Sequence, residues 1–304
     1  MTEGSGNRNL PRFCDYEGSD YRTAFWEGRG REYEDRAERI ALRRLLPLGG
    51  RRLIDIGGGF GRLAELYSGF NEIVLMDYSR SQLEDALQRL GPERITYVAA
   101  NVFAMPFTAG AFDTAVSVRV LHHLADVPRA LQAIRRVLGP GAPLVLEFAN
   151  KRNLKAILRH WLHRQAHNPF DPEPWEFAPL HFDFHPAYME RSLRDAGFRI
   201  ERQLAVSQFR VQVLKRLFGA DALAAVDGWL QRPTAFLRLA PSMFLRARAG
   251  GEAGAPASPL FCCPTCRGRL AHEHDALLCT DCGRRWSNSG GIYDFRQPLN
   301  DGDS

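Results

Sequence analysis

The stretch from residue 52 to residue 150 constrains the fold more than any other part of this 304-residue chain. Apolar runs typical of buried strands alternate there with segments whose apolar residues recur at helical spacing. The runs are LIDI, EIVLMD, ITYVAA, FDTAVSV and PLVLEFA, and the segments between them include GRLAELY, SQLEDALQRL and VPRALQAIRRVL. Because alternating strands and helices build βαβ units, the sequence predicts an α/β fold with helices on both faces of a parallel sheet.

The regions around this pattern predict the domain organisation. Residues 1–50 mix polar and aromatic residues and end in a helical pattern, which predicts an N-terminal helical cap. The main domain is expected over 51–248, because a helix and a strand follow in YMERSLRDAGFRIERQLAV and SMFLRARA predicts a last strand. Irregular, partly helical stretches at 151–185 and 208–240 interrupt it and are expected to be insertions.

A cysteine cluster predicts a separate C-terminal module. Residues 249–260 are small and rich in Gly, Pro and Ser, so they are expected to be a linker. Over 261–304, two CxxC pairs are separated by twelve residues; they comprise Cys263, Cys266, Cys279 and Cys282. Four thiolates close a tetrahedron around Zn²⁺ and leave no open position for chemistry. We therefore expect a zinc ribbon with a structural metal ion.

Charge and hydropathy limit the kinds of partner and the compartment that the sequence predicts. The formal net charge is +5, and three of the 40 basic residues are lysines, so the excess is weak support for a nucleic-acid partner. No apolar stretch approaches the roughly 18 to 20 residues of a spanning helix, and MTEGSGNRNL lacks the features of a signal peptide. Cysteines spaced for metal are typical of a reducing compartment, so we expect a cytoplasmic protein.

A glycine-rich turn follows the first predicted strand. In LIDIGGGFG, residues 53–61, the strand ends near Asp55, and Gly57, Gly59 and Gly61 follow. Glycines let a backbone approach a ligand closely, and a helix after the turn would direct free N–H groups at it. A dinucleotide fingerprint would have to start at Gly59, two residues beyond the point where the strand delivers the turn. The frame that fits without a gap is apolar-apolar-Asp-x-Gly-x-Gly-x-Gly.

This frame resembles motif I of the class I S-adenosylmethionine-dependent methyltransferases. Residues 50–207 continue the resemblance, with Asp77 closing EIVLMD and the order of features in AANVFAMPFTAGAFDTAVSVRVLHHL. The similarity is greatest to the branch that includes ubiquinone and menaquinone methyltransferases. It implies a Rossmann-like methyltransferase that uses S-adenosylmethionine as cofactor.

The resemblance assigns roles to individual residues. The glycines would wrap the methionine part of the cofactor, and Asp77 would accept hydrogen bonds from the ribose hydroxyls. Asn101 stands where the family usually has Asp, and its amide oxygen would accept from the adenine amino group. The expected cofactor-binding residues are Asp55, Gly57, Gly59, Gly61, Asp77, Asn101, Val102 and Arg119.

Three histidines are the candidate catalytic residues. Methyl transfer from a sulfonium is an in-line displacement that needs a base only when the nucleophile must lose a proton. In LHFDFHP, His181 and His185 flank Asp183 at a spacing of two, so an extended chain would place all three on one face. His122 follows the fourth predicted strand. The alternative interpretation is that these histidines only pack.

The insertions predict a small, hydrophobic acceptor. NLKAILRHWLHRQ combines an apolar stripe with basic residues, which favours a membrane surface if it is exposed and an ordinary packed helix if it is not. We expect both insertions to form a lid over a lipid-like acceptor. Alternatives are an rRNA or tRNA methyltransferase, or a cofactor-binding partner protein with little catalysis. The ribbon resembles those of a methyltransferase-activating subunit, so it could also contact a protein partner.

Overall fold

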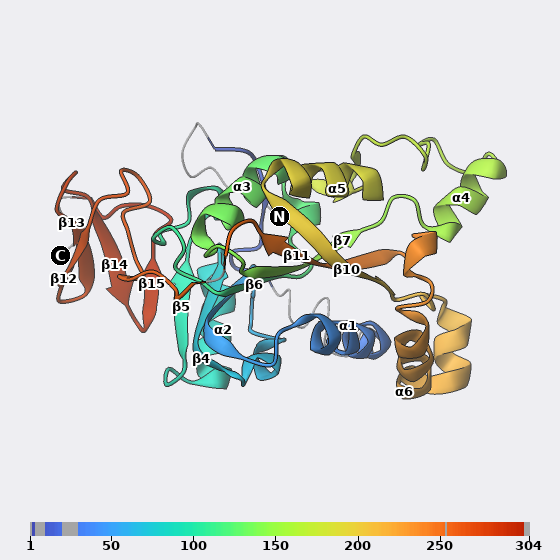
Figure 1. Cartoon of the computed structure of the whole chain (residues 1–304), viewed down its shortest axis with the longest axis horizontal. Coiled ribbons are helices and arrows are strands. Elements are labelled where there is room, and N and C mark those ends of the chain that lie inside the picture. Colours follow the sequence, from blue (N-terminus) through green and yellow to red (C-terminus); the bar gives the residue numbers. More distant parts are fainter. Residues whose placement is uncertain (1, 4–9, 20–29, 253, 301–304) are drawn as a thin grey trace.

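The computed structural model describes residues 2–3, 10–19, 30–252 and 254–300, and an eleven-stranded mixed sheet runs through it (Figure 1). Its order is β10-β11-β7-β6-β3-β4-β5-β15-β14-β13-β12. The parallel centre consists of β3 (Gly50–Ile56), β4 (Phe70–Asp77), β5 (Ile95–Ala99), β6 (Thr114–Ser117) and β7 (Pro143–Ala149). At one edge, β11 (Ser242–Ala249) runs antiparallel to β7 and to β10 (Phe198–Val206). The predicted α/β sheet is confirmed.

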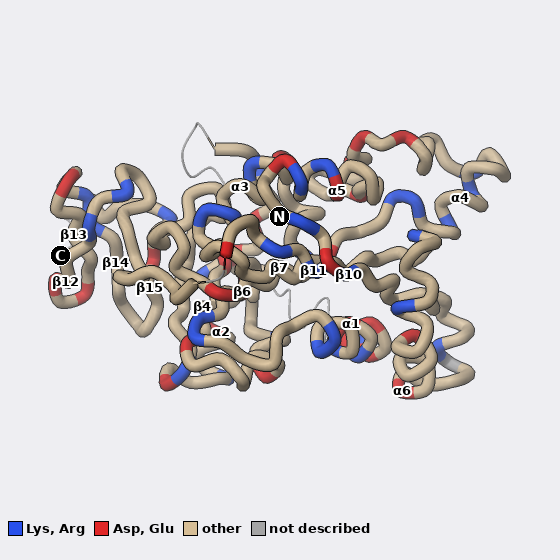
Figure 2. Tube along the Cα trace, viewed as in Figure 1, with Lys and Arg blue, Asp and Glu red and all other residues tan. Residues whose placement is uncertain are grey.

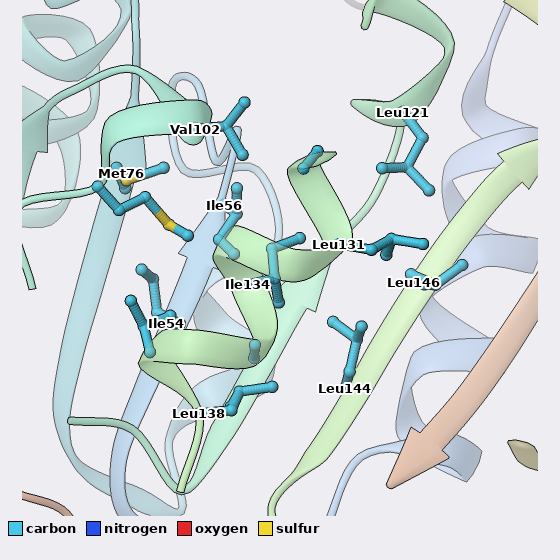
Figure 3. Close-up of a cluster of buried hydrophobic side chains, with 14 of the residues drawn as sticks. Ile54, Ile56, Met76, Val102, Leu121, Leu131, Ile134, Leu138, Leu144 and Leu146 are labelled. Atoms are coloured by element: carbon cyan, nitrogen blue, oxygen red, sulfur yellow. The ribbon is translucent and has the colours of Figure 1, made fainter. Parts of the chain in front are cut away.

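Helices cover both faces of the sheet. The helices on one face are α3 (Val127–Val137) and α5 (Pro186–Asp195); those on the other are α1 (Glu32–Leu45), α2 (Arg80–Leu90) and α6 (Gln212–Leu230). Alternate residues of each strand enter opposite layers: Ile54 and Ile56 pack under α3, whereas Leu53 packs under α1. Figure 3 shows the layer under α3. A fully buried aliphatic side chain contributes about 1.5 to 3 kcal/mol, so these two layers dominate the stability of the domain.

The segment after the glycine turn is a correction to the sequence analysis. An α-helix was expected over GRLAELY, but a series of turns leads into a short 3₁₀ helix, η2 (Ala64–Tyr67). Gly61 has a φ of 72°, a left-handed conformation that a right-handed helix cannot include. The Tyr67 hydroxyl then donates to Asp55 at 2.8 Å, which joins the end of this segment to β3.

The cysteine-rich module continues the central sheet. Its strands are β12 (Leu270–Glu273), β13 (Ala276–Cys279), β14 (Arg285–Ser289) and β15 (Ile292–Asp294), and β15 pairs in parallel with β5. Phe261 packs against Phe107, Tyr293 and Phe295 at ring-centroid distances of 5.8, 4.7 and 5.3 Å. The expected linker also meets the main domain, because Ala257 donates its backbone N–H to Gly110. The linker-like composition of residues 249–260 did not predict this docking.

The two insertions leave apolar side chains on the surface. The first contains α4 (Leu154–Trp161) and a hairpin of β8 (Trp175–Ala178) and β9 (His181–Asp183); the second contains α6 and the 3₁₀ helix η5 (Ala235–Leu237). Their exposed large apolar residues include Leu154, Leu158, Trp161, Leu162, Leu217, Phe218, Trp229 and Phe236. Lys and Arg follow the chain around α4 (Figure 2). Within the described ranges, no helix has the length and apolar character needed to cross a bilayer.

We expect Phe261→Ala to loosen the attachment of the ribbon. Removing a partly buried ring should lower the free energy of unfolding by about 2 kcal/mol, below the range for fully buried Phe. Thermal unfolding measures the change, and proteolysis within residues 249–260 should become faster. The matched control is Phe236→Ala, because that ring is 73% exposed and its loss should cost less than about 0.5 kcal/mol. Equal stability of the two variants would contradict the docking.

Candidate cofactor and acceptor site

A cavity lies at the carboxyl ends of β3, β4 and β5. Its wall comprises the turn after β3, the ends of the next two strands, the loop that follows β6 and the N-terminal segment around residues 13–16. Ligands of open α/β sheets bind at this edge. Of the expected cofactor residues, all but Gly61 line the cavity. The β-carbon of an alanine at position 61 would instead lie 2.6 Å from Leu90, so packing explains that glycine.

Gly57 and Gly59 serve different purposes, although both have positive φ. A β-carbon at position 57 would lie 2.2 Å from a methyl carbon of Val120, so a side chain there would collide with the protein itself. At position 59 the nearest atoms would be carboxylate and amide oxygens of Asp77 and Gln82, both at 3.9 Å. Both of these residues line the cavity. Gly59 is therefore the position where the missing side chain leaves room for a ligand.

Asp77 is held in place at the end of β4. Its carboxylate accepts from the backbone N–H groups of Gly59 at 2.8 Å and Ser79 at 2.9 Å. Burial raises its pKa, and these backbone hydrogen bonds counteract that shift. The carboxylate is thus fixed beside the glycine turn with lone pairs still available to accept hydroxyl groups.

Three buried polar atoms in the cavity wall have no hydrogen-bond partner among the described residues. They are Oε1 of Gln82, Nδ2 of Asn101 and Nδ1 of His123. The amide oxygen of Asn101 already accepts from the backbone N–H of Phe103 at 2.9 Å, so the unpaired group is a donor. Buried polar atoms without a hydrogen-bond partner are rare and destabilise a protein, which indicates that a polar ligand forms hydrogen bonds with them. Sequence reasoning did not find Gln82.

Asp55 lies in the same wall with a strongly shifted pKa. Burial raises the pKa to about 7, although the hydrogen bond from Tyr67 acts in the opposite direction. A cation bound beside this carboxyl would favour the ionised form. Asp55 is therefore suited to a positively charged ligand group and would release a proton when that group binds near neutral pH.

Arg119 holds the cavity wall to α1. Its guanidinium donates to the fully buried carboxylate of Glu38 at 2.8 and 2.5 Å, and Arg62 donates to the same carboxylate at 2.7 Å. Burial by itself would raise the pKa of Glu38, but the two guanidinium groups lower it. The backbone of Arg119 adopts a φ of 62° and donates to Glu147 at 3.1 Å. Arg119 therefore lines the cavity and also holds the loop after β6 to α1 through Glu38.

The structure separates the three candidate catalytic histidines. His185 caps α5, where its Nδ1 accepts from the backbone of Ala187, and it is not among the cavity residues. His122 does not line the cavity either, whereas its neighbour His123 does. His181 packs edge to face against His123, with ring centroids 4.9 Å apart. Sequence reasoning missed the role of His123, because two adjacent histidines leave open which one faces the ligand.

The insertions contribute little to the cavity wall. The hairpin of β8 and β9 contacts the 3₁₀ helix η4 (Leu121–His123), and His181 comes from this hairpin. By contrast, α6 packs on α1, and no residue of either insertion is in the cavity lining within the described chain. The expected lid over the cavity is therefore not formed by α4 or α6 in this conformation.

The ribbon cysteines converge as their spacing predicted. The sulfurs of Cys263 and Cys282 lie 3.8 Å apart, and those of Cys266 and Cys279 lie 3.4 Å apart. A tetrahedron with Zn–S bonds of 2.3 Å has edges of about 3.8 Å, so the four sulfurs fit one zinc ion. Cys262 is adjacent in sequence but is not part of the cluster.

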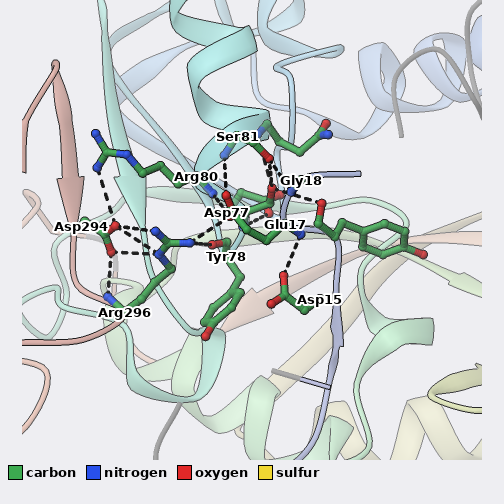
Figure 4. A network of polar contacts seen from close by, with 12 residues as sticks. Asp15, Glu17, Gly18, Asp77, Tyr78, Arg80, Ser81, Asp294 and Arg296 are labelled. Carbon is green, nitrogen blue, oxygen red and sulfur yellow. Dashed lines mark hydrogen bonds and ion pairs between the residues drawn. The ribbon is translucent and has the colours of Figure 1, made fainter. Parts of the chain in front are cut away.

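A polar network joins the ribbon to the cavity rim (Figure 4). Arg296, just after β15, donates to Glu17 at 2.9 Å and to the carbonyl of Tyr78 at 3.4 Å. Glu17 in turn accepts from the backbone N–H of Arg80 at 2.6 Å. Tyr78 follows Asp77 directly. The ribbon therefore helps to position the N-terminal segment over the cavity.

Comparisons with known proteins agree with this geometry. A family described as methyltransferase domain matches residues 54–146. The ubiquinone/menaquinone biosynthesis C-methyltransferase UbiE of Haemophilus ducreyi is 37% identical over 109 residues, which is 33% of this chain and 42% of that protein. The O-methyltransferase resE of Aspergillus sclerotiorum is 31% identical over 176 residues, covering 55% and 61%. The chain thus spans between two fifths and two thirds of the length of these relatives.

Solved structures support the same fold. One solved structure is the complex between the Haloferax volcanii Trm112 methyltransferase activator and a methyltransferase. A chain of this complex superposes with a TM-score of 0.53 and 18% identity, covering 76% of this chain and 98% of that one. Residues 54–146 therefore match a methyltransferase domain, and the chain has the Rossmann-like α/β fold seen in this solved structure. Its sequence relatives include enzymes named for quinone biosynthesis.

We expect Gly59→Val to weaken binding of S-adenosylmethionine at least about tenfold, or ~1.4 kcal/mol. The valine would extend toward Asp77 and Gln82, into the space that the ligand needs. Gly91→Val is the matched control, since Gly91 also has positive φ and no atom near its missing β-carbon, but lies outside the cavity. Both variants should lose similar stability. Calorimetry showing equal cofactor affinity in the two would contradict the assignment of Gly59.

Cofactor affinity should depend on pH through Asp55. S-adenosylmethionine carries positive charge, so its binding favours the ionised carboxyl and should tighten as pH rises toward about 7, then level off. Asp55→Asn should remove this dependence. Tyr67→Phe removes a hydrogen bond that lowers the pKa of Asp55, so it should move the inflection to higher pH. A flat profile in the unmodified protein, measured by calorimetry from pH 5 to 9, would show that Asp55 does not face the charge.

Proposed function

We propose that this protein is a methyltransferase that uses S-adenosylmethionine to methylate a small, hydrophobic acceptor. The observation that carries the proposal is the cavity wall, where an open position at Gly59, the carboxylate of Asp77 and the unpaired amide atoms of Gln82 and Asn101 line one space. These groups suit the hydroxyls and ring nitrogens of a nucleoside. When bound, the cofactor supplies an electrophilic methyl group on a sulfonium.

The chain's own residues would hold this cofactor by a division of labour. Gly57 and Gly59 permit close approach of the backbone, and Asp55 provides negative charge for the cationic end. Asp77 and Gln82 would accept hydrogen bonds from the ribose hydroxyls. The amide N–H of Asn101, next to Val102, would donate a hydrogen bond to the adenine ring. Gly61 shapes the turn, and Arg119 fixes the wall through Glu38. Of the three candidate histidines, we propose that His181 contributes to the site.

The exposed apolar surface supports a hydrophobic acceptor. Leu158 and Trp161 on α4 are 47% and 65% exposed, and Lys and Arg follow the chain around this helix (Figure 2). A helix of this kind binds at the interface of an anionic membrane, where lipid-like molecules are concentrated. UbiE is named for ubiquinone and menaquinone biosynthesis, which fits an acceptor of this class. Peripheral contact with a membrane would bring such an acceptor to the protein.

The ribbon is proposed to bind one structural Zn²⁺ through its four cysteines. A closed set of four thiolates leaves no position for substrate, so this metal would stabilise the module and not react. The module's contacts to β5 and to Glu17 then make it an internal support of the cavity. The structural neighbour forms a complex with the Trm112 activator, so the alternative is that this module binds a protein partner.

Transfer of a radiolabelled methyl group to candidate acceptors tests the proposal. The acceptors are hydroquinones in anionic vesicles, a water-soluble hydroquinone, total RNA and no addition. We expect label in the organic extract of the vesicle sample. Label in RNA would overturn the hydrophobic acceptor, and cofactor binding without any transfer would overturn the activity.

Matched surface variants refine the same experiment. Trp161→Ser and Leu158→Ser should lower transfer to the acceptor in vesicles several-fold and leave transfer to the soluble acceptor unchanged. Leu48→Ser is the control, because Leu48 is fully exposed on the loop before β3, outside both insertions. Equal effects of all three substitutions would show that α4 does not bring the protein to the membrane.

A further inference from the structure

Three metal-binding side chains from distant parts of the chain meet beside the cofactor cavity. They are Cys14 in the short strand β2 (Cys14–Asp15), His123 at the end of η4 and His181 at the start of β9. One ligand atom from each lies within 4.8 Å of the others. More than fifty residues separate each from the next along the chain, so only the tertiary structure brings them together. Cys14 and His123 both line the cavity.

Backbone contacts hold the three segments in register. Phe13 pairs with Leu124 in an isolated antiparallel bridge, and Ala125 donates to the carbonyl of Arg12 at 3.0 Å. The hairpin that carries His181 contacts η4. The cluster therefore belongs to the packed wall of the cavity and does not depend on a chance approach of surface side chains.

The orientation of His181 is that of a metal ligand. Its Nδ1 lies 2.8 Å from the carbonyl oxygen of Pro179, to which the N–H donates. That hydrogen bond places the proton on Nδ1 and leaves the lone pair on Nε2. Metal-bound histidines are commonly oriented in this way, with one nitrogen on the metal and the other donating to a carbonyl or carboxylate.

We propose that Cys14, His123 and His181 bind a second divalent transition metal, with zinc as the preferred ion. One sulfur and two imidazole nitrogens form a three-ligand set of the kind found in catalytic zinc sites, which keep a fourth position open. Ligand atoms around zinc are about 3.3 to 3.8 Å apart, so groups that lie within 4.8 Å of one another would have to approach by up to about 1 to 1.5 Å when the metal binds. The ribbon site differs, because its four thiolates leave nothing open.

Because Cys14 and His123 line the cavity that we propose for the cofactor, an acceptor in that cavity could take the fourth position on the metal, which defines the class of acceptor. A zinc ion there takes an oxygen or sulfur anion, and it lowers the pKa of the bound hydroxyl or thiol. The acceptor's proton leaves to solvent when the oxygen or sulfur binds. This assignment rests on the proposed function and narrows it to acceptors with an ionisable hydroxyl or thiol, such as hydroquinones.

Metal analysis of the whole 304-residue chain tests the site without any need for activity. The unmodified protein, loaded with zinc and dialysed, should hold about one ion per chain more than Cys14→Ser or His181→Gln. His272→Ala is the matched control, because this exposed histidine lies on β12 and should leave the metal content unchanged. With Co²⁺ in place of zinc, both cluster variants should lose the same absorption component. Unchanged metal content in both variants would overturn the site.

Two further readouts separate this inference from the proposed function. Cofactor affinity by calorimetry should stay near that of the unmodified protein in His181→Gln, because His181 does not line the cavity. Methyl transfer should fall at least about tenfold at neutral pH and recover partly at higher pH, where the acceptor ionises unaided. A metal-free variant with an unchanged pH profile would overturn the role in acceptor binding. Failure of the unmodified protein to transfer methyl groups, with the second ion present, would overturn the proposed function alone.

Discussion

The parallel pairing of β3, β4 and β5 is the constraint on which the rest of the structure depends. Ile56 pairs with Met76, and Asp77 pairs with Ala99, so the three strands end at one edge within a few residues. Backbone N–H groups at Gly57 and Gly58 then donate to the carbonyl of Met76 at 2.7 and 3.1 Å. This geometry delivers the glycine turn, Asp77 and the segment of Asn101 to one cavity, although 44 positions of sequence separate Gly57 from Asn101.

A buried charge cluster holds the other side of that cavity. Glu38 on α1 is completely buried and is shared by Arg62 from the glycine turn and Arg119 from the loop after β6. Removing one partner of such a cluster typically costs about 3 to 5 kcal/mol, because a charge is left without compensation. The cluster therefore joins α1 to the segment after the glycine turn, through Arg62, and to the loop after β6, through Arg119. It also explains why Arg119 keeps a backbone conformation that few side chains favour.

The ribbon is docked on the main domain and extends its sheet. Its last strand extends the sheet at β5, and Arg296 reaches both the N-terminal segment and the residue next to Asp77. An exposed edge strand is a ready site for pairing, and here the chain covers that edge with its own C-terminal module. A change in the folding of the ribbon would therefore affect the cavity, through the pairing of β15 with β5 and through Arg296.

The sequence by itself determined the strand and helix alternation, the glycine turn, Asp77 and the four-cysteine cluster. These features are local: apolar periodicity, backbone freedom at glycine and ligand spacing act within a few residues. Only the tertiary structure decided that Gly61 serves packing, that His123 and not His122 faces the cavity, and that α6 packs on α1 instead of forming a lid. It also brought Cys14, His123 and His181 together. The physical reason is that such contacts join residues far apart in sequence, and no local pattern records which distant surfaces will pack together.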